Sequence, residues 1–86
     1  MSDATELTLY GKPDCHLCDE AETLLRSLAV EQPLHYRKID IQSAPDLFER
    51  YRYRIPVIEL PDGVTLDWPV TTGQIRRALA AAARRP

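Results

Sequence analysis

Cys15 and Cys18 are the chain's only two cysteines, and they are the residues whose type and spacing could do chemistry. Two thiols three positions apart can form a disulfide, bind a metal ion, or fill space in a core as small apolar groups. A structural disulfide between them would close a very small loop, and stabilisation by loop closure falls with loop length. The spacing therefore favours a reactive or metal-binding pair over a permanent cross-link.

The position predicted for Cys15 favours a thiolate. It lies where a predicted strand over 6–10 gives way to a predicted helix, and the unpaired N–H groups and dipole at a helix start stabilise an anion. Lys12 adds positive potential, and His16 adds more when it is protonated. Three nearby carboxylates oppose this effect: Asp14, Asp19 and Glu20. We expect a Cys15 pKa below that of an ordinary cysteine.

Cys18 falls in the first turn of the same helix, on the same side as Cys15 and less exposed. A thiol in that place can attack a mixed disulfide formed at Cys15 and release the reduced partner. The pair therefore predicts thiol–disulfide exchange, with Cys15 as nucleophile and Cys18 as resolving thiol.

Metal binding is the alternative interpretation of the two cysteines. A closed structural zinc site needs four ligands, and the only other soft candidates are His16 and His35. His16 lies between the cysteines and points elsewhere on a helix, and His35 lies on a strand with no partner at ligand spacing, so we assign no metal ligands. A metal or iron–sulfur cluster shared by two chains, a non-catalytic module that binds a partner, and two simply buried cysteines stay open.

The remaining elements follow from hydrophobic periodicity and turn residues. Further strands are predicted over 34–41, 56–60 and 64–68, and further helices over 43–51 and 71–85. In the first helix five apolar residues form one face: Leu17, Ala21, Leu24, Leu25 and Leu28. The predicted helix caps are Asp14, Ser43, and Thr71 with Gln74 in capping-box spacing.

The predicted order is β-α-β-α-β-β-α. Its β-α-β opening requires parallel strands with a right-handed crossover, and the hairpin over 56–68 adds an antiparallel strand. We expect an α/β fold in which a four-stranded mixed sheet carries helices on both faces, as a single domain over 1–86 and as a monomer.

Composition excludes several classes of function. The formal net charge of −2 argues against nucleic acid as the main partner, and "ERYRYR" (49–54) is interpreted as a solvated helix end whose tyrosines pack on the core. No run approaches the roughly 18 apolar residues of a membrane span. The acidic N-terminus does not resemble a secretory signal, so we expect a cytoplasmic protein.

The stretch "LYGKPDCHLCDEAETLL" resembles the active-site segment of glutaredoxins in the thioredoxin-fold superfamily, and "IPV" at 55–57 falls where that family places a cis-proline. The resemblance implies a thioredoxin-like fold and exchange with protein or glutathione disulfides, with no cofactor beyond glutathione as co-substrate. It implies that Pro56 is the cis-proline, that Lys12 contacts a glutathione carboxylate, and that Val57 pairs with its backbone. His16 and Ile55 complete the predicted substrate site.

Two departures from the family pattern concern glutathione. Ile55 stands where glutaredoxins usually carry threonine or another polar residue, and "WPVTTGQ" replaces the Gly-Gly stretch that holds the γ-glutamyl end. Both argue against tight glutathione binding.

Overall fold

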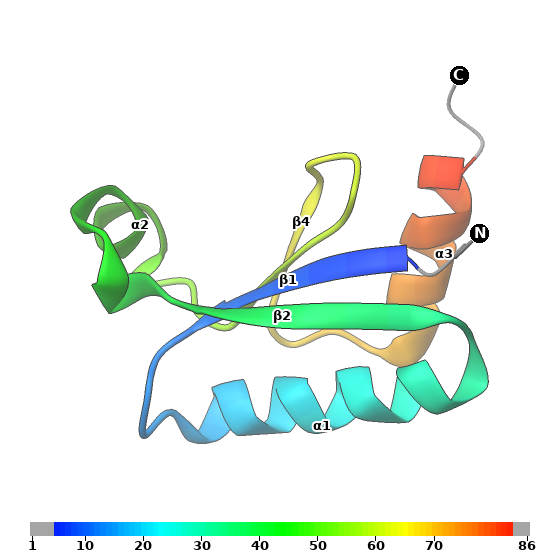
Figure 1. Cartoon of the computed structure of the whole chain (residues 1–86), viewed down its shortest axis with the longest axis horizontal. Coiled ribbons are helices and arrows are strands. Elements are labelled where there is room, and N and C mark those ends of the chain that lie inside the picture. The colour runs from blue at the N-terminus through cyan, green and yellow to red at the C-terminus, as the bar shows by residue number, and fades with distance from the viewer. Residues whose placement is uncertain (1–4, 84–86) are drawn as a thin grey trace.

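A computed structural model describes residues 5–83 of the chain, and Figure 1 shows its elements. They follow one another as β1 (Thr5–Gly11), α1 (His16–Glu31), β2 (Leu34–Asp40), a short 3-10 helix η1 (Ile41–Ser43), α2 (Pro45–Tyr51), β3 (Val57–Glu59), β4 (Thr65–Asp67) and α3 (Thr72–Ala83). Apart from η1, this order is the one that the sequence predicts.

The four strands form one mixed sheet in the order β2-β1-β3-β4. β1 pairs in parallel with β2, while β3 is antiparallel to both β1 and β4. The parallel pair is the β-α-β unit, and the antiparallel pair is the predicted hairpin. The expected α/β fold, with a four-stranded mixed sheet, is confirmed.

Helices cover both faces of the sheet, as predicted. Because strand side chains alternate between faces, Leu7 and Leu9 of β1 point to the main core while Tyr10 points to the other side. The main core joins the sheet to α1 and α3 through nine buried residues: Leu7, Leu9, Ala21, Leu25, Leu28, Leu34, Ile58, Leu60 and Ile75. A smaller cluster under α2 contains Ile41, Tyr51 and Val57. In Figure 1, α1 begins at the end of the sheet where α2 lies, and α3 lies at the opposite end.

The start of α1 differs from the prediction. Cys15, not Asp14, is the N-cap, because Asp14 adopts a left-handed conformation with φ of 57° in the turn before the helix. Aspartate tolerates this conformation better than most residues do. The buried face accordingly begins at Cys18 and continues through Ala21, Leu25 and Leu28, whereas Leu17 is 47% exposed.

The other two helix starts give one correction and one confirmation. Ser43 does not cap α2, because it belongs to η1, where its hydroxyl donates to the Asp40 carbonyl at 2.6 Å. The N-cap of α2 is Ala44, which makes no side-chain hydrogen bond to the helix. At α3, the Thr71 N–H donates to Gln74 Oε1 at 2.8 Å and the Gln74 N–H donates to Thr71 Oγ1 at 3.1 Å, so the capping box is confirmed. The last predicted positions of α3, residues 84 and 85, lie outside the described residues.

The tyrosines of "ERYRYR" do not share one environment. Tyr51 is 4% exposed and stacks on Tyr10, with 4.5 Å between the ring centroids. Tyr53 is 85% exposed, so the prediction that the tyrosines pack on the core is wrong for this residue. Tyr53 lies in the turn after α2, where helical periodicity no longer determines which side chains face the sheet.

Candidate active site around Cys15 and Cys18

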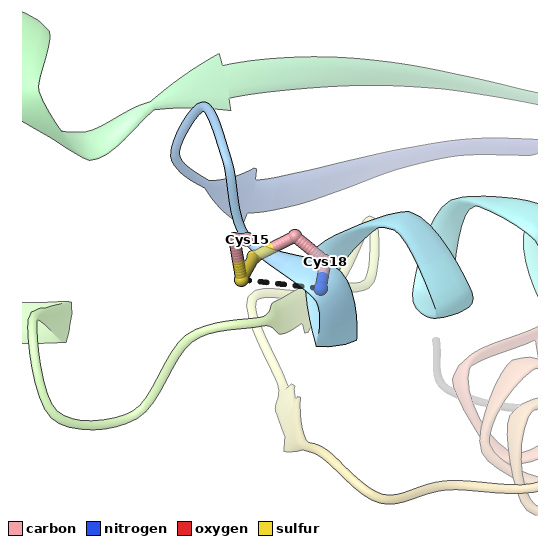
Figure 2. Close-up of a disulfide and its surroundings, with 2 residues drawn as sticks. All are labelled: Cys15 and Cys18. Carbon is pink, nitrogen blue, oxygen red and sulfur yellow. Dashed lines mark hydrogen bonds between the residues drawn. A yellow bond between two sulfur atoms is a disulfide. The ribbon is translucent and has the colours of Figure 1, made fainter.

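The cysteines lie at one end of the sheet, where three strands place their termini together. β1 ends at Gly11, in register with Asp40 at the end of β2, and the preceding residue Tyr10 is in register with Val57 at the start of β3. A short turn carries the chain from Gly11 into α1. Cys15 and Cys18 form a disulfide there, with 5.2 Å between their Cα atoms (Figure 2).

Cys15 caps α1 with its own sulfur. The Cys18 N–H donates to Cys15 Sγ at 3.2 Å, shown as the dashed line in Figure 2, and the Asp19 N–H donates to the Cys15 carbonyl at 3.1 Å. The Cys15 backbone is extended, with φ of −113° and ψ of 108°, as an N-cap residue requires. The side chain of Cys15 thus occupies the place where a helix start stabilises negative charge, and a thiolate there would accept a charge-assisted hydrogen bond.

Cys18 is buried against the end of β1. Its residue is 7% exposed, while Cys15 is half-buried. A Cβ atom added to Gly11 would lie 3.0 Å from Cys18 Sγ and 3.3 Å from Cys18 Cβ, which is closer than ordinary van der Waals contact. Gly11 therefore makes room for the second sulfur. Sequence reasoning missed this role, although a glycine at the end of the strand, four residues before Cys15, was a signal for a close approach.

On the β3 side, the chain enters the strand through a cis peptide bond between Ile55 and Pro56. Pro56 is fully buried and precedes Val57, so the antiparallel register places it beside Gly11. Val57 is also fully buried, in a strand paired on both sides, whereas Ile55 precedes the strand and is half-exposed. Of these predicted site residues, Ile55 is the most accessible to a substrate. A second cis bond joins Trp68 to Pro69.

On the β2 side, a cavity of about 260 Å³ opens beside Cys18. Its lining includes Lys12, Lys38 and Asp40. Lys38 Nζ lies 3.1 Å from Glu22 Oε1, and this contact is the main cause that lowers the pKa of Glu22. Lys12 is exposed and, among residues 5–83, makes no ion pair, so its ammonium group can meet an anionic substrate.

His16 and Arg54 each have a carboxylate partner. The His16 side chain is 87% exposed, and its Nε2 lies 2.9 Å from Glu20 Oε2. Arg54 Nη2 lies 2.8 Å from Asp67 Oδ1 on β4, and this bond raises the pKa of Arg54. His16, a predicted site residue, is thus bound to an acidic neighbour, and so is Arg54.

No group of three or more His, Cys, Asp or Glu residues within 5–83 is arranged to hold a metal ion. In the same range, no helix combines the length and the apolar character that crossing a membrane demands.

Fold and site together define a thioredoxin-fold domain with a C-x-x-C disulfide at the start of its first helix. The chain belongs to the family described as Glutaredoxin-like domain (DUF836), whose pattern matches residues 6–80. The resemblance to glutaredoxin-like proteins is thereby confirmed.

Solved structures agree with this assignment. The target protein XcR50 from X. campestris is 37% identical, with a TM-score of 0.74, over 87% of this chain and 96% of that one. Protein Ne2328 from Nitrosomonas europaea is 25% identical, with a TM-score of 0.78, over 91% of this chain and 94% of that one. Thioredoxin 1 from Thermosipho africanus shares the fold, with a TM-score of 0.64 at 12% identity over 92% and 99% of the two chains.

Proposed function

We propose that this protein is a thiol–disulfide oxidoreductase in which Cys15 is the nucleophile and Cys18 the resolving thiol. The observation that carries the proposal is the position of Cys15 as the N-cap of α1, with its sulfur accepting the Cys18 N–H at 3.2 Å. A sulfur in that position is stabilised as an anion, which is the reactive form in disulfide exchange.

The reaction starts from the reduced protein. The Cys15 thiolate attacks one sulfur of a substrate disulfide, a Cys15–substrate bond forms, and the other substrate sulfur leaves with the electron pair and takes up a proton. The Cys18 thiol loses its proton and attacks Cys15 Sγ, which breaks the mixed disulfide and releases the second substrate thiol. The protein ends in the disulfide form that the structure contains, having given two electrons to the substrate.

The substrate class that we propose is protein disulfides or glutathione disulfides, handled by a monomer in the cytoplasm. Lys12 supports this class because it is exposed and lines the same cavity as Cys18, so its ammonium group can meet a carboxylate there. Ile55 precedes Pro56 on the opposite side of the disulfide, and it is half-exposed, so a substrate can reach it. A short extended segment of the substrate would lie between these two points.

The test compares two variants that each keep one thiol, Cys18→Ser and Cys15→Ser. We expect the remaining Cys15 of Cys18→Ser to be alkylated by iodoacetamide at a pH where an ordinary thiol, with a pKa of about 8.5, is still protonated. The remaining Cys18 of Cys15→Ser should react slowly, because its side chain is buried against Gly11.

Two results would count against the proposal. One is the combination of two observations: Cys15 in Cys18→Ser titrates like an ordinary thiol, and the wild-type protein reaches no redox equilibrium with glutathione. The other is purified protein that holds stoichiometric zinc or a coloured iron–sulfur cluster on these cysteines, because such a protein would be a metal or cluster carrier.

A further inference from the structure

Arginines and exposed aromatic rings gather where α2 ends and the chain turns toward β3. The Arg52 guanidinium carbon lies 4.6 Å from the centroid of the Tyr53 ring and 5.6 Å from that of the Phe48 ring. Arg50 belongs to the same turn and is exposed, with its guanidinium carbon 5.8 Å from the Tyr51 ring centroid. We call the four exposed residues Phe48, Arg50, Arg52 and Tyr53 the arginine–aromatic patch.

Both arginines of this patch lack an ion-pair partner among the described residues. Arg50 and Arg52 make no ion pair among residues 5–83, whereas the neighbouring Arg54 is bound to Asp67. The Arg52 guanidinium lies within cation–π distance of both the Phe48 and the Tyr53 rings, and it is exposed. Such a group is prepared to bind a carboxylate through two parallel hydrogen bonds.

The patch lies close to the disulfide. Tyr53 precedes Pro56 by three residues, a distance of at most about 11 Å along an extended chain. Pro56 is placed beside Gly11 by the strand register, and Gly11 lies against Cys18 Sγ. In Figure 2 the chain that enters β3 runs past the two labelled cysteines. Tyr53, at one end of the patch, is therefore within reach of a substrate that reacts at Cys15 if its chain continues for a few residues on that side.

We propose that the arginine–aromatic patch docks an acidic segment of a protein disulfide substrate, which names the substrate class of the function proposed above and rests on it. Tyrosine and arginine are enriched in the residues that dominate protein–protein binding. The complementary partner carries carboxylates three or more residues from its reacting cysteine, since an extended chain rises about 3.3 Å per residue. Arg50 and Arg52, which make no ion pair within residues 5–83, are complementary in charge to these carboxylates.

The test uses two peptides of equal length, each with one cysteine held as a mixed disulfide with neutral 2-thiopyridine. One carries glutamates three to six positions from the cysteine, and the other carries lysines there. Attack by reduced protein releases pyridine-2-thione and then, through Cys18, the peptide thiol, so each turnover converts the protein dithiol to its disulfide. The rate at which dithiothreitol, which has no charge, reduces each peptide is measured as well. The ratio of these two rates corrects for the different reactivity of the two peptides.

We expect wild-type protein to prefer the acidic peptide, relative to dithiothreitol, by about threefold to tenfold at low ionic strength, with the preference shrinking as salt is added. Arg52→Glu should abolish or reverse the preference, and Arg52→Lys should keep part of it. The matched control is Arg77→Glu, an identical charge reversal at an exposed position of α3, at the far end of the sheet, which should keep the wild-type preference.

The outcomes separate the two proposals. If wild-type protein reacts with neither peptide nor with a small neutral disulfide, the proposed function itself fails. If it reacts with both peptides in the ratio seen for dithiothreitol, the function stands and the docking proposal is wrong. If Arg52→Glu and Arg77→Glu lose the preference for the acidic peptide equally, the effect is due to net charge. If a single-stranded oligonucleotide inhibits the reaction more strongly than an acidic peptide does, the patch binds nucleic acid. Either result overturns the proposal.

Discussion

At the scale of single residues, the site depends on how closely two sulfurs and one glycine are packed. Cys15 faces the helix start and is partly accessible, while Cys18 is buried where Gly11 leaves no side chain in the way. The same two cysteines therefore differ in exposure, and this difference suits the order of attack that we propose.

Gly11→Ala tests this packing. The new methyl group would lie 3.0 Å from Cys18 Sγ, so the disulfide form must shift to accept it. We expect the free energy of unfolding of the oxidised protein to fall by about 1–3 kcal/mol, as for other overpacked cores, and the redox equilibrium with glutathione to move toward the dithiol.

Gly73→Ala is the matched control, because a Cβ atom at this position of α3 would meet nothing closer than 3.8 Å. It should leave the redox equilibrium near its wild-type value and should not lower the free energy of unfolding, because alanine favours a helix more than glycine does. Oxidised Gly11→Ala that unfolds at the same denaturant concentration as wild type would show that Gly11 is not needed for the close approach.

The environment of Tyr10 predicts how the stability of the protein depends on pH. Its hydroxyl donates to Glu59 Oε1 at 2.6 Å, and this bond, with burial, raises the pKa of Tyr10 to about 12. Because the folded-state pKa lies above the unfolded value of about 10, this stabilisation is complete below pH 10 and disappears as the pH rises to about 12. Denaturant titrations should show stability falling over that window.

Tyr10→Phe removes the titrating hydroxyl. It should be less stable than wild type by about 1 kcal/mol at neutral pH, because one hydrogen bond is lost. The difference from wild type should shrink between pH 10 and 12. A difference that stays constant through this window would show that the Tyr10–Glu59 bond does not contribute as described.

At the scale of elements, periodicity predicted the kinds and order of helices and strands, but not where each helix begins. Leu17 and Cys18 are both apolar and adjacent, so periodicity alone could not decide which of them starts the buried face of α1. The start depends on Asp14, whose left-handed conformation moves the cap to Cys15. In the same way Ser43 has the right type for a cap, but η1 uses it before α2 begins.

The helix caps can be tested with two substitutions, one expected to raise and the other to lower the stability of the protein. Ala44→Ser should stabilise the protein by about 0.5–1 kcal/mol, because Ala44 has the extended backbone of an N-cap and no side-chain acceptor for α2. Thr71→Ala should destabilise it by about 1 kcal/mol by breaking the capping box of α3. Thermal unfolding checks both. A neutral or destabilising Ala44→Ser would mean that Ala44 is not the N-cap of α2.

At the scale of the whole molecule, the sheet brings together what is distant in sequence. The order of strands and helices could be predicted because hydrophobic patterns and turn residues are local, and the C-x-x-C motif could be placed because it joins two of these elements. Two site features could not be predicted. The contact of Gly11 with Cys18 and the exposure of Tyr53 depend on how the segments pack. The glycine before the motif signals a close approach but not its partner, and "ERYRYR" does not tell which of its tyrosines is exposed.

The central claim is that Cys15 reacts first and Cys18 second, and trapping the intermediate tests it most directly. Reduced Cys18→Ser and Cys15→Ser are each incubated with a disulfide peptide, and the mixed disulfides are counted by intact-protein mass spectrometry. We predict that Cys18→Ser accumulates one peptide on Cys15, because no second thiol can release it, while Cys15→Ser accumulates almost none. A stable adduct on Cys18 in Cys15→Ser, with none on Cys15 in Cys18→Ser, would contradict this order of attack.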